Sequence, residues 1–104
     1  MDYVAQYLNI LNTNARYESA FSHYVFTAEK GKKYTRIVSE TVWHSNGDRS
    51  GRSSHAFINH ETGEIFKSES WKKPAKGVRY SLPQDADTLC QRVDPYGSYL
   101  YMNR

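Results

Sequence analysis

The chain has 104 residues, which is the length of a single domain (1–104), with a formal net charge of +3 and a pI of about 9.0. Apolar residues are only 38% of the chain, but nine tyrosines, four phenylalanines and two tryptophans supply enough ring area for a small core and argue against disorder. The single cysteine, Cys90, excludes an intrachain disulfide, and no signal peptide or membrane-spanning run is present, so we expect a cytoplasmic protein without a membrane partner.

The first part of the chain predicts a helix followed by an ambiguous segment. Residues 2–9 place apolar side chains at helical spacing, with Asp2 as a candidate N-cap, and the polar residues 12–14 interrupt this pattern. Residues 15–28 are compatible with helix or strand, although the β-branched and aromatic stretch 22–27 favours a strand.

The middle of the chain predicts antiparallel strands. Residues 29–32 indicate a turn, and 33–43 form the clearest strand because they are rich in β-branched residues and lack Gly and Pro. The polar, glycine-rich residues 45–51 predict a flexible loop, with Arg49 and Arg52 at its tip.

A hairpin over residues 54–71 is the central element of the predicted sheet. Its arms are 54–59 and 64–71, and the turn between them ends at Gly63. Two apolar pairs face each other across this hairpin, Phe57 with Phe66 and Ile58 with Ile65. Because neighbouring side chains alternate along a strand, the two pairs must lie on opposite faces.

The C-terminal third predicts short elements. We expect a returning strand at 78–82, one or two helical turns at 83–91 and an edge strand at 98–102. The predicted fold class is therefore α+β, a short antiparallel sheet of three to five strands with one or two short helices.

Candidate catalytic and metal-binding residues are few. His55 and His60 are five residues apart beside glutamates, without the spacing of a zinc motif, and Cys90 is most simply a small buried thiol. No Gly-x-Ser-x-Gly or phosphate-binding loop is present. We therefore predict no catalytic residue, no metal and no cofactor, and keep a small hydrolase or nuclease using His55 and His60 as the third alternative.

Positive charge is concentrated in the middle of the chain. Residues 30–79 hold eleven of the fourteen cationic side chains and five acids, which leaves +6 there. Cations attract phosphates through counterion release, and aromatic rings stack on unpaired bases. The candidate nucleic-acid-binding residues are Arg36, Arg49, Arg52, Lys67, Trp71, Lys72, Lys73, Lys76 and Arg79. The alternative interpretation is that the cationic side chains merely cover the solvent-exposed face of a sheet and that Trp71 belongs to the core.

Residues 33–82 resemble a family of small, uncharacterised proteins encoded by tailed bacteriophages. The similarity rests on Lys33–Val38, Arg52–Ile58, Thr62–Lys67 and, most specifically, Ser70–Leu82 with its Trp-x-x-Pro-Ala-Lys-Gly-Val-Arg run. The resemblance implies a phage or phage-derived origin, and therefore the host cytoplasm, and it transfers no activity.

The leading hypothesis is a non-enzymatic protein that binds nucleic acid, preferentially single strands, through the basic and aromatic surface around residues 67–80. The alternative is a protein-interaction module, either an inhibitor of a host protein or a minor virion component. Exposed Tyr99 and Tyr101 on a free edge strand would serve such a module by strand addition.

Overall fold

The computed structural model describes residues 2–101 and begins with helix α1 (Tyr3–Asn14). Asp2 caps it as predicted, because its side chain accepts a hydrogen bond from the Ala5 amide at 2.9 Å. The predicted interruption at residues 12–14 is wrong. Asn12 stays helical while its side chain bonds both the backbone N–H and the C=O of Phe26, so a tertiary contact uses the amide that would otherwise end the helix.

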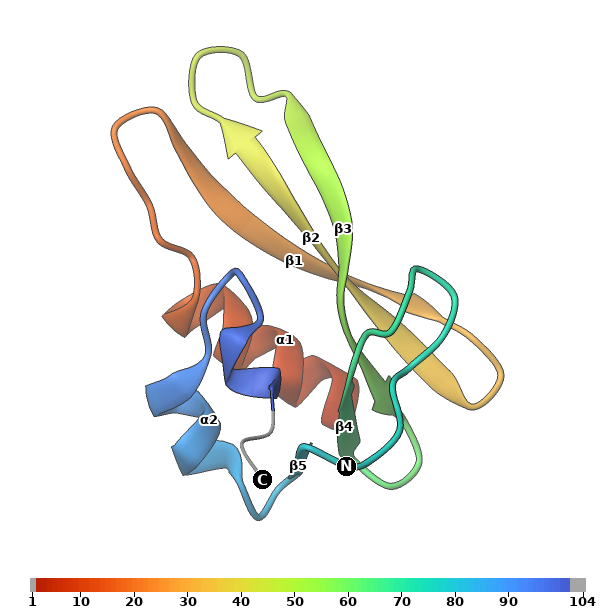
Figure 1. Ribbon diagram of the computed structural model, residues 1–104. Coiled ribbons are helices and arrows are strands. Elements are labelled where there is room, and N and C mark those ends of the chain that lie inside the picture. The colour runs from red at the N-terminus through yellow and green to blue at the C-terminus, as the bar shows by residue number, and fades with distance from the viewer. Residues whose placement is uncertain (1, 102–104) are drawn as a thin grey trace.

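Five antiparallel strands form one sheet in the order β1-β2-β3-β4-β5, which confirms the predicted fold class (Figure 1). The strands are β1 (Ser22–Lys30), β2 (Tyr34–Trp43), β3 (Arg49–Asn59), β4 (Glu64–Lys67) and β5 (Tyr80–Ser81). The loop predicted at 45–51 is too long, because β3 begins at Arg49 and pairs it with Val42. Arg49 and Arg52 therefore project from a strand and not from a mobile tip.

The β3–β4 hairpin has the predicted register, with Phe57 opposite Phe66 and Ile58 opposite Ile65. Its second arm ends at Lys67, four residues earlier than predicted. The chain then turns back on itself, since Ser68 bridges to Pro74 and the Ala75 amide bonds the Lys67 carbonyl. Residues 68–79 thus form a folded loop between β4 and β5.

The two faces of the sheet have different coverings. Ile37, Ala56, Ile58 and Ile65 point to the face on which α1 and α2 (Ala86–Arg92) pack, and they belong to the main apolar core with Tyr7, Leu11 and Leu89. The alternating residues on the same strands, including Arg36 and Phe57, point to the opposite face, over which the 68–79 segment folds.

The C-terminal segment differs from the prediction. Residues Ser98–Leu100 form a 3₁₀ helix, η1, in place of the predicted edge strand, and Met102 lies outside the described residues. Tyr99 is only 7% exposed because its ring packs into the core, whereas Tyr101 is exposed. Cys90 is exposed and not buried as predicted, since α2 turns Leu89 toward the core and Cys90 away from it.

A buried polar chain joins α1, β3 and η1. The hydroxyls of Tyr7 and Tyr99 lie 2.6 Å apart, and the Tyr99 hydroxyl lies 2.6 Å from Nε2 of His55. Burial lowers the pKa of His55 to about 4, so its ring is neutral at pH 7. A neutral Nε2 accepts the Tyr99 proton, and Tyr7 then donates to Tyr99. No helix within the described residues has the length and apolar character needed to span a membrane.

Candidate nucleic-acid interface

The 68–79 segment is held on the sheet by hydrogen bonds that position Trp71. The amides of Glu69 and Ser70 both bond the Lys73 carbonyl, which closes a tight turn with Trp71 inside it. From β2, Arg36 reaches across and donates from Nε to the Trp71 carbonyl at 2.7 Å. The tryptophan is therefore fixed over the sheet face that the helices do not cover.

The Trp71 ring lies on the surface and contacts two arginines. It is 38% exposed, with the guanidinium carbon of Arg36 at 4.4 Å and that of Arg52 at 5.2 Å from the ring centre. These distances are within the range of cation–π attraction. Trp71 is thus not a core residue, but its immediate cationic neighbours are arginines from β2 and β3, not the lysines that follow it in sequence.

Two carboxylates neutralise most of the arginine charge near Trp71. Glu29 accepts from Arg36 at 2.8 Å and also from Arg52, and the Arg36 hydrogen bond holds the pKa of the Glu29 carboxyl below its usual value. Glu40 lies 3.6 Å from Arg52 and 3.7 Å from Arg49. Three cations against two carboxylates leave a formal charge of +1, so this cluster contributes little net attraction for phosphate.

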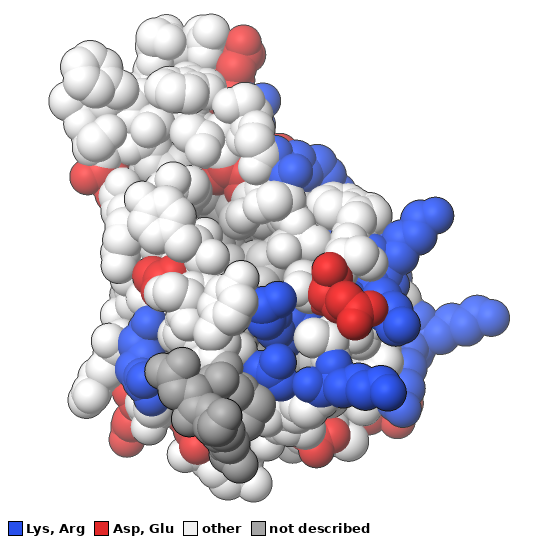
Figure 2. Space-filling view, in the orientation of Figure 1, with Lys and Arg blue, Asp and Glu red and all other residues white. Residues whose placement is uncertain are grey.

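A more strongly basic hollow lies beside this cluster, between the β1–β2 turn and the 68–79 segment. It has a volume of about 410 Å³, and its lining includes five cations and one carboxylate, a formal charge of +4. These charged residues are Glu29, Lys30, Lys32, Lys33, Arg36 and Lys72. In Figure 2 the Lys and Arg side chains gather on this side of the molecule, whereas the end with the β2–β3 turn is largely uncharged.

The lysines of this hollow are available to a ligand. Within residues 2–101, Lys30, Lys32, Lys33 and Lys72 form no ion pair, and all four are exposed. The ring of Tyr34 also lines the hollow, packed edge-on against Phe66. An anion that entered here would meet unpaired ammonium groups from two segments that are forty residues apart in sequence.

The structure brings some of the predicted residues together and separates others. Arg36, Arg49, Arg52 and Trp71 form the cluster on the open sheet face, and Lys72 joins the hollow. Lys73 is paired with Glu69 at 3.3 Å. Lys76 is exposed.

Lys67 and Arg79 both contact the C-terminal segment. Lys67 donates to the Ser68 carbonyl and lies 4.7 Å from the centre of the Tyr101 ring. Arg79 donates to the carbonyls of Leu100, Lys76 and Gly77, at 2.7, 2.8 and 2.7 Å. Three carbonyls therefore occupy the guanidinium of Arg79, which makes it a structural residue in this chain.

Lys30, Lys32 and Lys33 were not among the predicted site residues. The sequence does contain the signal, a Lys-Gly-Lys-Lys run at the predicted turn 29–32 and the first residue of the strand that follows, but this run lies far from residues 67–80 along the chain. The β1–β2 turn lies close to Lys72 because β1 pairs with β2 and because the 68–79 segment folds over the sheet.

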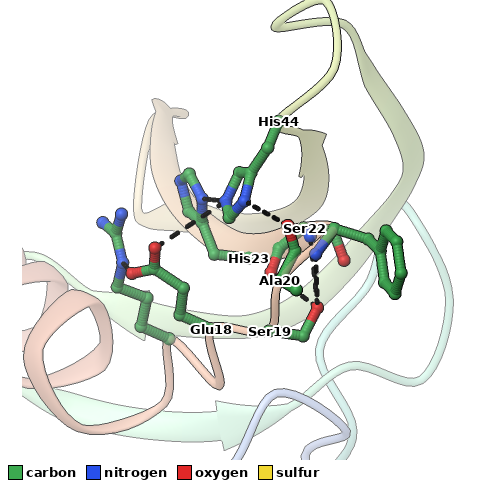
Figure 3. Close-up of polar contacts among 8 residues, drawn as sticks. Glu18, Ser19, Ala20, Ser22, His23 and His44 are labelled. Atoms are coloured by element: carbon green, nitrogen blue, oxygen red, sulfur yellow. Dashed lines mark hydrogen bonds and ion pairs between the residues drawn. The ribbon is translucent and has the colours of Figure 1, made fainter.

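The histidines predicted for the hydrolase alternative do not form a common site. His55 is buried and bonded to Tyr99, while His60 bonds the hydroxyl of Thr35 at 3.0 Å. A different group of potential metal ligands, Glu18, His23 and His44, comes together at the other end of β1 and β2 (Figure 3). Only one histidine of this group lies on β1, and the other two residues belong to the segments before β1 and after β2.

Comparisons with known proteins identify a family but no activity. A family model described as a family of unknown function, DUF7717, matches residues 2–102. Neither the curated proteins nor the solved structures gave a match.

Proposed function

We propose, for a chain that belongs to the DUF7717 family of unknown function, that it binds single-stranded nucleic acid without catalysing a reaction. The observation that carries the proposal is the juxtaposition of the lysine-lined hollow with the exposed ring of Trp71. Arg36 connects the two, because it lines the hollow and its guanidinium lies against the Trp71 ring.

The phosphates would be bound by the lysines of the hollow. Lys30, Lys32, Lys33 and Lys72 are exposed and without an acidic partner in the described chain, so they can exchange their counterions for phosphate oxygens. Arg49 and Arg52 already have carboxylate partners and add less attraction. This assigns the main electrostatic role to the β1–β2 turn and Lys72, and a smaller one to the predicted arginines.

The bases would be bound by Trp71. Stacking of a base on an aromatic ring contributes about 1–3 kcal/mol and requires an unpaired base. The guanidinium of Arg36 is held by Glu29 and the Trp71 carbonyl, so the ring presents its remaining exposed area in a fixed orientation. Tyr34 in the same hollow offers a second ring, although it is only half-exposed.

The salt dependence of binding tests this proposal. If four lysines each contact one phosphate of a single strand, log K should fall with log[salt] with a slope of about −3, which is about 50-fold between about 50 and 200 mM salt. Fluorescence anisotropy of a labelled oligothymidylate measures this slope. An affinity that stays constant as salt rises, or no measurable binding at the lowest salt, would refute the proposal.

A matched pair of substitutions locates the interface. Lys32→Gln and Arg92→Gln each remove one exposed positive charge, but Lys32 lines the hollow and Arg92 lies on α2. We expect Lys32→Gln to reduce the slope by about 0.7, and Arg92→Gln to leave it unchanged. Equal effects of the two substitutions would mean that binding reflects net charge alone.

The protein-interaction alternative lacks the edge strand on which it was based. Tyr99 is buried in η1, and the outer edge of β1 is partly covered, because the Tyr24 amide bonds the Arg16 carbonyl and Asn12 bonds Phe26. A pull-down from nuclease-treated lysate discriminates the two functions, since a partner that survives nuclease favours the alternative.

The resemblance of residues 33–82 to small bacteriophage proteins supports a setting for this function. A phage protein that coats or sequesters single strands would act in the cytoplasm of an infected cell, together with the nucleic acid that it binds. The basic hollow is compatible with that setting.

A further inference from the structure

Two histidines and a glutamate meet at the end of the β1–β2 pair that is remote from the basic hollow. His23 lies on β1 opposite Val42, and His44 follows β2 with its amide bonded to the Phe21 carbonyl. Side chains two residues apart on a strand lie on the same face, so this register sets His44 diagonally beside His23. Glu18 approaches them from the segment between α1 and β1 (Figure 3).

The ligand atoms of these residues are spaced as a small metal ion requires. Nδ1 of His23 lies 2.9 Å from Nε2 of His44, which in turn lies 3.8 Å from Oε2 of Glu18. One ligand atom from each of the three residues lies within 4.8 Å of those of the other two. Tetrahedral zinc with bonds of about 2.0–2.1 Å holds its ligand atoms about 3.3–3.4 Å apart. The two separations lie on either side of that value, so small side-chain rotations suffice.

Neighbouring groups orient the ligands. Nδ1 of His44 lies 3.3 Å from the Ala20 carbonyl, which makes it the protonated nitrogen and leaves the lone pair of Nε2 facing His23. Arg16 donates to Oε1 of Glu18 at 2.9 Å, while the other carboxylate oxygen, Oε2, faces the histidines. Two of the three ligands, His44 and Glu18, are thus each held by a second group, an arrangement typical of metal sites in proteins.

The contact between the two imidazoles also determines their tautomers. Without metal, the close contact of the two imidazoles requires a proton between Nδ1 of His23 and Nε2 of His44. A bound ion would take the place of that proton, which moves to Nε2 of His23 so that the ring stays neutral.

We propose that Glu18, His23 and His44 form a zinc-binding site that fastens the segment before β1 to the end of β2. Two nitrogens and one carboxylate oxygen supply three ligands, and a solvent molecule completes the tetrahedron. The site is independent of the nucleic-acid proposal, because none of its residues lines the basic hollow or contacts Trp71.

Isothermal titration of the untagged chain with zinc sulfate tests the site. We expect one ion per chain, and replacement by cobalt(II) should give the visible absorption of a tetrahedral complex. Binding should weaken in acid, because an imidazole nitrogen must be deprotonated to coordinate the ion. Saturating zinc should also raise the unfolding temperature. Absence of binding at pH 7.5 would overturn the proposal.

Substitutions and ring resonances identify the ligands. His44→Ala and Glu18→Gln should each weaken zinc binding by at least about tenfold, since even the loss of a supporting group costs that much. His60→Ala removes a histidine outside the site and should change nothing. If a variant fails to fold, ¹⁵N spectra of the unmodified chain decide. Zinc should shift Nδ1 of His23 and Nε2 of His44, and a shift confined to other histidines would contradict the assignment.

Discussion

Acid should destabilise this protein through one buried histidine. Burial lowers the pKa of His55 from 6.5 to about 4, although Asp94 and a backbone hydrogen bond to Pro95 oppose the effect. As the pH falls, the unfolded chain takes up the proton first, so the contribution of His55 is complete above about pH 6.5 and is lost as the pH falls toward 4. A protonated Nε2 would also be unable to accept the Tyr99 hydroxyl.

The size of the effect follows from the two pKa values. A difference of about 2.5 corresponds to about 3 kcal/mol when the loss is complete, and to about 2 kcal/mol between pH 7.5 and 5. Urea unfolding at several pH values in this range measures it, before most carboxylates titrate. The window ends at pH 5 so that acids such as Glu29, whose pKa is lowered, do not contribute.

Two glutamine substitutions separate His55 from the other histidines. His55→Gln should be less stable at pH 7.5 but should lose about 2 kcal/mol less than the unmodified chain on going to pH 5. His60→Gln should keep the full pH dependence. If His55→Gln retains the same fall in stability, the buried ring is not its source and the reasoning fails.

Other substitutions test the buried hydrogen bonds that link Tyr7, Tyr99 and His55, and the packing of the β3–β4 turn. Tyr7→Phe removes one hydrogen bond and should cost about 1 kcal/mol, whereas Tyr99→Phe leaves two buried partners unmatched and should cost about 2–4 kcal/mol in urea unfolding. Gly47→Ala should cost only about 1 kcal/mol for its positive φ of 75°, because nothing lies within 4 Å of the added carbon. Gly63→Ala should cost clearly more, since its added carbon would lie 2.6 Å from the Leu82 carbonyl oxygen; equal thermal stability of the two variants would contradict this.

Local patterns in the sequence predicted the strands well. The β3–β4 register follows from a four-residue turn and two apolar pairs, and the 33–43 strand follows from its β-branched content. Asn12 and Tyr99 were misjudged because their roles depend on distant partners. The local sequence around a polar residue in a helix, or around an aromatic residue near a terminus, does not show whether that residue forms a tertiary hydrogen bond.

The site was predictable in its charge but not in its arrangement. The concentration of cations in residues 30–79 pointed to this side of the molecule, and Trp71 is exposed as a binding residue must be. Sequence proximity nevertheless selected Lys67 and Arg79, which serve the C-terminal segment, and omitted the β1–β2 turn. The ion pairs of Arg36 and Arg52 with Glu29 depend on the register of the strands, so the composition of the chain could not predict them.

Tryptophan fluorescence tests the interface most directly, because the chain has a matched reporter. Trp43 lies at the end of β2, seven residues beyond Arg36, and is exposed to a degree similar to that of Trp71. In Trp43→Phe, only Trp71 emits, and we predict that an oligothymidylate quenches it in a saturable and salt-sensitive way. In Trp71→Phe, only Trp43 emits, and it should not respond. Unchanged Trp71 emission with bound oligonucleotide, or equal quenching of both residues, would contradict binding at the hollow beside Trp71.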